Sequence, residues 1–202
     1  MELKDSFLEL DSIFRSFALM DSKTNKRASK FLSYVLRHHP ELINLTLDTQ
    51  GWANTQELIE KATRGDHVLT FEQLVEIVET NDKQRFSFNE DRSQIRTNQG
   101  HSLQFIDLKM ETQAPPEILY HGSVGKFVDS IKEHGLQKGS RQYVHLSIEI
   151  QTAIEVGSRR GKPVVLTVQA MKMYNAGYQF YLSDNQIWLT EHVPSEFLEF
   201  PE

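Results

Sequence analysis

The sequence predicts an α+β fold built from two parts. In the first half, apolar residues recur at helical spacing in three segments, and a β-hairpin pattern follows them. Beyond a Pro-Pro pair, short strand patterns with few helices take over. The chain has 202 residues, which is enough for one domain of ordinary size or for two small ones.

The first helix of the body is predicted near residues 25–39. One face must be buried, because apolar residues recur at i, i+3, i+4, i+7 and i+8: Ala28, Phe31, Leu32, Val35 and Leu36. Pro40 lacks an N–H group and ends the helix. Arg37 points away from the apolar face, and His38 lies on its flank. Because a helix C-terminus is partially negative, this pair either binds an anion through its side chains alone or is a solvated last turn.

Two further helices begin at capping-box patterns, after a turn at residues 48–51. Asn54-Thr-Gln-Glu57 opens the second helix, which Gly65-Asp66 ends and whose buried face is Leu58, Ile59 and Ala62. Thr70-Phe-Glu-Gln73 opens the third helix, whose predicted buried face is Phe71, Leu74, Val75 and Val78. Before all three, residues 1–23 are expected to form an amphipathic helical extension without chemistry of its own.

A change of period from 3.6 to two marks a β-hairpin after the third helix. Arg85-Phe-Ser-Phe88 alternates, Asn89-Glu-Asp91 turns, and Ser93-Gln-Ile-Arg-Thr97 alternates back. Three helices followed by a hairpin is the element order of a winged-helix domain. The segment Glu111–Pro116 then reads as a linker, because Pro-Pro favours extended backbone.

The second half alternates short strands with single helices. A strand at Ile118-Leu-Tyr120 is predicted to end in His121-Gly122-Ser123, with the histidine at the strand end. Val124, Phe127, Val128 and Ile131 mark a helix that Gly135 terminates. In the strand at residues 143–147, Tyr143 and His145 share the face opposite Val144 and Leu146. A helix near residues 149–156 precedes Gly157, and the remaining predicted strands are 163–168, 178–182, 186–190 and 197–200.

Composition excludes several classes of protein. The chain has no cysteine, so disulfides, thiolate metal sites and a cysteine nucleophile are ruled out, and the composition fits a cytoplasmic protein. No apolar run approaches the ~20 residues that span a bilayer, and the N-terminus does not look like a signal peptide. With a net charge of −6, any contact with nucleic acid is expected through a small local patch, with a shallow salt dependence.

Motifs for common catalytic sites are missing from the sequence. His38 and His39 are adjacent, so on a helix they point ~100° apart and cannot chelate one metal ion, and no His-Glu-x-x-His occurs. There is no Gly-x-Ser-x-Gly elbow, no Walker loop and no Gly-x-Gly-x-x-Gly. We therefore expect no metal, and a bound nucleotide must be held in another way.

Basic residues at the ends of predicted elements form the first candidate site: Arg37, His38, Arg85 and Arg141. Each arginine considered alone is most simply interpreted as an ordinary surface residue. Taken together they suit a phosphate dianion, because the guanidinium fork matches phosphate bidentately.

Two histidine-serine pairs form the second candidate site. In His121-Gly122-Ser123 and His145-Leu146-Ser147, a histidine at a predicted strand end is followed within two residues by a serine. Gly122 would permit close approach of a ligand to the backbone. The alternative for each histidine is a satisfied residue at a strand end. Gln99-Gly100-His101 is a weaker signal of the same kind.

These residues as a set resemble the RNA 2′-phosphotransferase (tRNA 2′-phosphotransferase) family over roughly residues 26–200. Seven motifs in order carry the resemblance: Ser29–His38, Asp48–Trp52, Asp82–Ser87, Ile95–His101, Leu119–Ser123, Gly135-Leu136 and Arg141–Ser147. Ser123 departs from the threonine of many members but keeps the hydroxyl.

The resemblance implies an organisation of the chain and an activity. It implies a winged-helix-like RNA lobe at 26–110, a linker at 111–116 and an ADP-ribosyltransferase-like, β-rich NAD lobe at 117–202, with residues 1–25 as an uncovered extension. The implied reaction removes an internal 2′-phosphate from RNA with NAD as co-substrate, as in tRNA splicing or RNA repair. It passes through RNA-2′-phospho-ADP-ribose and gives 2′-OH RNA, ADP-ribose 1″,2″-cyclic phosphate and nicotinamide.

The family's site residues carry over by position. Its catalytic Arg-His-Arg-Arg set falls on Arg37, His38, Arg85 and Arg141, and its NAD-binding residues fall on His121, Gly122, Ser123, His145 and Ser147. Two alternatives stay open: an ADP-ribosyltransferase acting on a terminal phosphate or another acceptor, and a non-enzymatic winged-helix binder of nucleic acid.

Overall fold

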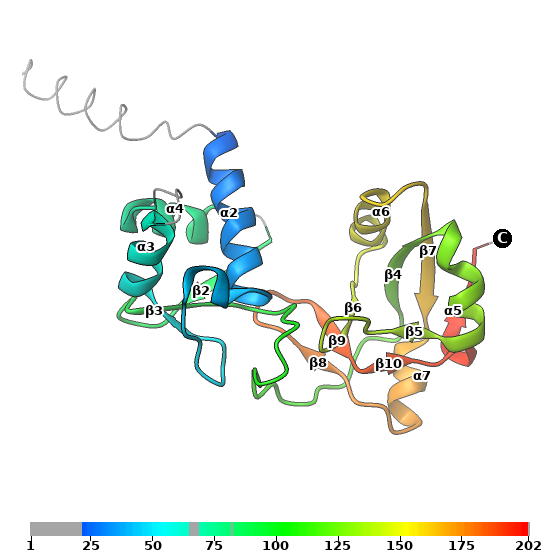
Figure 1. Ribbon diagram of the computed structural model, residues 1–202. Coiled ribbons are helices and arrows are strands. Elements are labelled where there is room, and N and C mark those ends of the chain that lie inside the picture. The colour runs from blue at the N-terminus through cyan, green and yellow to red at the C-terminus, as the bar shows by residue number, and fades with distance from the viewer. Residues whose placement is uncertain (1–21, 65–68, 82, 202) are drawn as a thin grey trace, which may run out of the picture.

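The computed structural model describes residues 22–64, 69–81 and 83–201. Its helices and strands confirm a mixed α+β fold (Figure 1). The expected extension at 1–23 and the helix break at Gly65-Asp66 fall almost entirely outside these ranges. None of the helices within them combines the length and apolar character needed to cross a bilayer.

The first part packs helices against a small sheet. It contains α2 (Ser22–Arg37), a 3₁₀ turn η1 (Pro40–Ile43), α3 (Thr55–Arg64) and α4 (Phe71–Glu79). The strands β1 (Ala53–Asn54), β3 (Gln94–Thr97) and β2 (Phe86–Phe88) pair in that order, and β2 and β3 are the predicted hairpin, with Phe86 opposite Thr97. The core includes the predicted α2 residues Leu32, Val35 and Leu36, all fully buried.

Helix α4 starts as predicted, but the side that it buries only partly matches the predicted one. Thr70 and Gln73 form the full capping box. Leu74 and Ile77 are buried, whereas Phe71 is 40% exposed. The predicted face is therefore confirmed at Leu74 and at Val78, which packs against the core, and wrong at Phe71. Packing in the core turns the Leu74–Ile77 side of the helix inward and leaves Phe71 outside.

The second part contains three small sheets, ordered β11-β7-β4, β6-β9-β8 and β10-β5. Its elements are β4 (Leu119–Val124), η2 (Gly125–Phe127), α5 (Val128–His134), β5 (Leu136–Gln137), β6 (Val144–Leu146), α6 (Ile150–Ser158), β7 (Pro163–Val168), α7 (Ala170–Asn175), β8 (Tyr181–Leu182), β9 (Trp188–Thr190), β10 (His192–Val193), η3 (Ser195–Phe197) and β11 (Leu198–Glu199). A separate core fills this part, with Leu119, Leu166 and Phe180 fully buried.

Three local predictions in this part need correction. Strand β4 does not end at His121: it continues to Val124, because it pairs with β7 along its whole length, from Leu119 opposite Val168 to Val124 opposite Pro163. His145 is the central residue of β6 and not a strand end. Gly157 lies inside α6 rather than after it.

The predicted linker is attached to the second part. Thr112 forms an isolated antiparallel bridge with Tyr181, and the Gln113 N–H donates to the Phe180 carbonyl at 2.8 Å. Further bonds join the two parts directly: Arg96 pairs with Asp184 at 2.8 Å, and Asn185 donates to the Lys83 carbonyl at 2.9 Å. Polar contacts at defined positions therefore join the two parts of the protein.

Candidate functional site

Arg37 is the half-buried centre of the first candidate site. It is the last residue of α2. Burial, followed by the charges of Arg141 and Arg85, lowers its pKa to about 10, so it remains a cation at neutral pH. Within the described residues, its Nε and Nη2 atoms are buried without a hydrogen-bond partner. A buried guanidinium with unused donors and cationic neighbours is a strong site for an anion.

The other three predicted basic groups lie near enough to Arg37 to interact with it electrostatically. Burial, then Arg37 and Arg141, lowers the pKa of His38, which makes its neutral form dominant at pH 7. Arg141 is exposed as a whole, yet partial burial of its side chain, followed by the charges of Arg160 and Arg159, lowers its pKa. Arg85 donates from Nη1 to Asn81 Oδ1 at 3.2 Å. The structure thus brings groups from α2, the start of the hairpin and the loop before β6 close enough for their charges to interact.

One loop, residues 98–102, holds these groups in place. The Asn98 N–H donates to the Arg85 carbonyl at 2.9 Å, and the Ser102 N–H donates to the Arg37 carbonyl at 3.1 Å. The Ser102 hydroxyl lies 2.9 Å from His38 Nδ1. Gly100 has φ +90°, and a Cβ there would lie 3.5 Å from the Arg37 guanidinium carbon. Ser102 gave no recognisable signal in the sequence, because its role depends on a contact across 64 residues.

His101 in the same loop is a structural residue. It is 1% exposed, and its Nε2 lies 2.9 Å from the Thr97 hydroxyl. Burial is the main reason that its pKa falls to about 4. In the weak signal Gln99-Gly100-His101, Gln99 contacts His145 and Gly100 lies next to Arg37. His101 contacts neither candidate site and instead anchors the loop to Thr97.

His121 and His145 form a linked pair on neighbouring strands. His121 donates from Nδ1 to the His145 carbonyl at 3.1 Å, and His145 donates from Nδ1 to the Tyr143 carbonyl at 3.0 Å. Burial, then Arg141, lowers the pKa of His145 to about 3, so the ring is neutral. Its Nε2, which lies 2.6 Å from the Gln99 amide oxygen position, can then only accept. We therefore expect the Gln99 amide to present its NH₂ group there.

Gly122 presents an open backbone edge. Tyr120 exchanges backbone hydrogen bonds with Ser147 on the side of β4 that faces away from β7. Residues two apart on a strand direct their backbone groups to the same side, so the Gly122 N–H and C=O also face away from β7. In the described part of the chain, no strand pairs with this edge at Gly122.

The missing side chain of Gly122 makes room for a helix. A Cβ at this position would lie 1.8 Å from the Ala153 carbonyl oxygen of α6. The sequence predicted that Gly122 lets a ligand approach the backbone. In the structure, the space left by its missing side chain is filled by the Ala153 carbonyl. Ser123 is buried, and Ser147 donates its hydroxyl to the Glu149 carbonyl at 3.0 Å.

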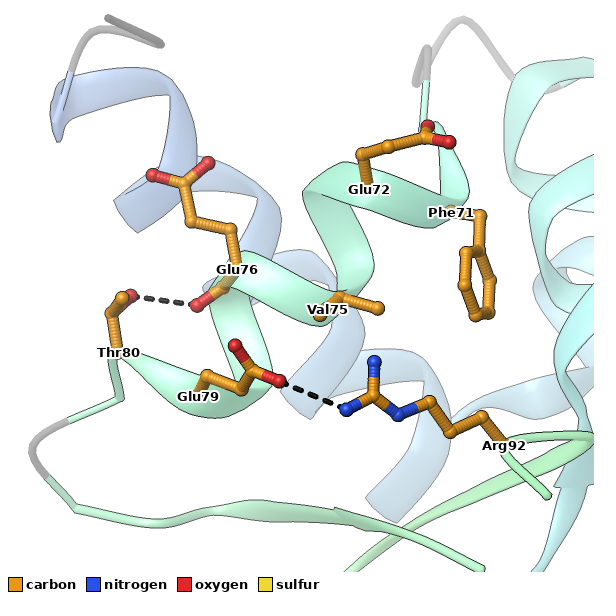
Figure 2. Close-up of a pocket in the computed structure, with 7 residues that line it drawn as sticks. All are labelled: Phe71, Glu72, Val75, Glu76, Glu79, Thr80 and Arg92. Carbon is orange, nitrogen blue, oxygen red and sulfur yellow. Dashed lines mark hydrogen bonds and ion pairs between the residues drawn. The ribbon is translucent and has the colours of Figure 1, made fainter. Parts of the chain in front are cut away.

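A surface pocket of about 440 Å³ lies elsewhere, along α4. Figure 2 shows Glu72, Glu76 and Glu79 around Phe71 and Val75, with Glu79 paired to Arg92 at 3.1 Å. None of the predicted site residues lines it. The described residues also contain no cluster of three or more histidine, aspartate or glutamate side chains arranged for a metal ion.

The buried histidines predict a loss of stability in acid. The pKa values of His101 and His145 are about 4 and about 3 in the folded protein, against 6.5 for a free ring. Below pH 6.5 the unfolded chain therefore binds more protons, and the free energy of unfolding is expected to fall as the pH drops toward 4. The slope approaches ~1.4 kcal/mol per pH unit for each ring. Urea denaturation at pH 7, 6, 5 and 4 measures this pH dependence of the free energy of unfolding. A His101→Asn variant should show a shallower slope. An identical slope would contradict the lowered pKa of His101.

Comparison with known proteins identifies the family. The family described as "RNA 2′-phosphotransferase, Tpt1 / KptA family" matches residues 23–192. A relative from Flavobacterium johnsoniae, named "Probable RNA 2′-phosphotransferase", is 52% identical over 181 residues, covering 90% of this chain and 99% of its own. Relatives of the same name from Pectobacterium carotovorum and Burkholderia pseudomallei are each 49% identical, covering 89% and 87% of this chain and 97% and 95% of their own. The resemblance read from the motifs is confirmed, and the chain belongs to the RNA 2′-phosphotransferase family.

Proposed function

We propose that this protein removes an internal 2′-phosphate from RNA and uses NAD as the acceptor of that phosphate. The observation that carries the proposal is Arg37, a half-buried cation with unused donors beside Arg85, Arg141 and His38, in a chain of this family. A phosphate monoester with a second pKa near ~6 is mostly a dianion at pH 7, and it matches this set of donors.

The NAD-binding role falls to the second part. A carboxamide carries one acceptor and a pair of donors, which complement the Gly122 N–H and C=O at the open edge of β4. We assign the nicotinamide end of NAD to this edge, with His121, Ser123, His145 and Ser147 shaping its surroundings. The half-buried pair His121–His145, whose lowered pKa values favour neutral rings, would keep this side of the site uncharged and fixed. On this proposal, residues 26–110 form the winged-helix-like RNA lobe, and residues 117–202 form the ADP-ribosyltransferase-like lobe.

In the first step, an oxygen of the RNA 2′-phosphate forms a bond to C1″ of the nicotinamide ribose. Nicotinamide leaves with the electron pair of the broken C–N bond and becomes neutral. This step requires little base catalysis, because the nucleophile is already ionised and the leaving group starts as a cation. The protein's contribution is to hold two anionic substrates together.

In the second step, the ribose 2″-hydroxyl attacks the phosphorus and the RNA 2′-oxygen leaves. We assign to His38 the transfer of the hydroxyl proton to the leaving RNA oxygen, because its lowered pKa keeps the ring neutral and able to accept a proton. Ser102 at Nδ1 fixes the ring orientation. Negative charge grows on the phosphate oxygens, where each preorganised arginine donor contributes ~2.7–4 kcal/mol.

The test uses a synthetic oligoribonucleotide with a single internal 2′-phosphate. With NAD we expect 2′-OH RNA, ADP-ribose 1″,2″-cyclic phosphate and nicotinamide in equal amounts, and without NAD no reaction. The same oligonucleotide without the 2′-phosphate is the matched control. A stable ADP-ribosylated RNA as the end product would support the alternative hypothesis of an ADP-ribosyltransferase. RNA binding without any product would support a non-enzymatic nucleic-acid binder.

A further inference from the structure

We propose that one exposed face of α2 binds the RNA strand that flanks the 2′-phosphate. This face, the α2 basic face, consists of Lys26, Arg27, Lys30 and Tyr34, all exposed. The inference rests on the proposed function, and it adds a binding surface outside the reacting groups.

Helical geometry places the α2 basic face opposite the buried side of the helix. Lys26, Lys30 and Tyr34 follow one another at i, i+4 and i+8, so their side chains lie along one stripe. Leu32, Val35 and Leu36, on the other side, are fully buried. The packing of α2 thus directs the cations and the tyrosine to solvent together.

The stripe leads to the candidate phosphate site. Arg37 ends α2, eleven residues beyond Lys26. At a rise of ~1.5 Å per residue the stripe is about 16 Å long, a distance that a stacked strand covers with about five nucleotides. A strand whose 2′-phosphate contacts Arg37 can therefore continue along the stripe.

The distribution of charge favours RNA on this face. The first turn of α2 has no acidic residue, and in the described ranges no ion pair links Lys26, Arg27 or Lys30 to a carboxylate. Helix α4 in the same part carries Glu72, Glu76 and Glu79 around its pocket (Figure 2). In a chain of net charge −6, phosphates are repelled there and attracted to α2.

Tyr34 adds a different kind of contact. Its side chain is 48% exposed, and its ring lies 4.7 Å from the His39 ring, centroid to centroid. An exposed aromatic ring between cations is the usual arrangement for stacking an unpaired base of a single strand. The occupant that fits this combination is single-stranded RNA.

The experiment compares a long and a short substrate in the double variant Lys26→Ala/Lys30→Ala. For a 12-mer with an internal 2′-phosphate, we expect KM to rise roughly tenfold at low salt while kcat and the KM of NAD stay unchanged. For a dinucleotide with the same 2′-phosphate, KM should stay within about twofold. The salt slope for the 12-mer should decrease by about 1.4, since each lost single-strand contact accounts for about 0.7. A Lys132→Ala/Lys172→Ala variant removes two exposed charges from the second part and should behave like the wild type.

Binding of a fluorescent, unphosphorylated 12-mer, followed by anisotropy, tests the surface independently of turnover. We expect the α2 double variant and Tyr34→Ala each to weaken it roughly tenfold, and Tyr34→Phe to restore it. Unchanged binding and unchanged KM for the 12-mer in the double variant would overturn the inference. Equal losses for the dinucleotide and the 12-mer would also overturn it. A wild type that binds the 12-mer through this face but never releases the 2′-phosphate would refute the proposed function alone.

Discussion

Replacing Arg141 with alanine is expected to make an RNA-2′-phospho-ADP-ribose intermediate accumulate. In the proposed mechanism the first step needs little charge stabilisation, whereas the second builds negative charge on a phosphate held by Arg37, Arg85 and Arg141. Loss of one such donor typically slows a step by ~10²–10³. Single-turnover reactions with end-labelled, 2′-phosphorylated RNA, resolved on a denaturing gel, should show a shifted band that persists in the variant.

A matched control separates this role from a general loss of charge. Arg159 is exposed and contributes to the lowered pKa of Arg141, yet we assign it no contact with the phosphate. Arg159→Ala should therefore turn over near the wild-type rate. Arg85→Ala should accumulate the same intermediate as Arg141→Ala. If both of these variants bind RNA normally and neither shows the shifted band, the assignment of the arginines to the second step is wrong.

Replacing Gly122 with alanine is expected to give the largest loss of stability. The added Cβ would lie 1.8 Å from the Ala153 carbonyl oxygen, so the backbone of α6 must move away from β4. Forced overpacking of this kind costs ~3 kcal/mol or more. In a chain of 202 residues, ~3 kcal/mol corresponds to a Tm that is lower by roughly 6–12 °C.

Gly125 provides the control for that measurement. A Cβ at Gly125 would meet nothing within 4 Å, so Gly125→Ala should unfold within ~0.5 kcal/mol of the wild type. Thermal melting followed by circular dichroism compares the two variants. Equal melting temperatures would mean that α6 yields easily and that Gly122 is not needed for its packing.

Local patterns predicted the elements that depend on neighbouring residues. The capping box at Thr70, the buried side of α2 and the hairpin of β2 and β3 were all confirmed. Elements whose ends depend on distant partners were misplaced. Strand β4 extends past His121 because β7, about 40 residues later, pairs with its whole length. The exposure of Phe71 depends on how α4 packs in the core.

The sequence by itself determined the family, the mixed α+β class and the identity of the basic and histidine residues of the candidate sites. These features depend only on the types of residues and their order along the chain. Only the tertiary structure decided that Arg85 and Arg141 lie near Arg37, that Ser102 and Gln99 support His38 and His145, and that α6 fills the space left by Gly122. Such contacts join residues tens of positions apart, and their geometry exists only once both cores have packed.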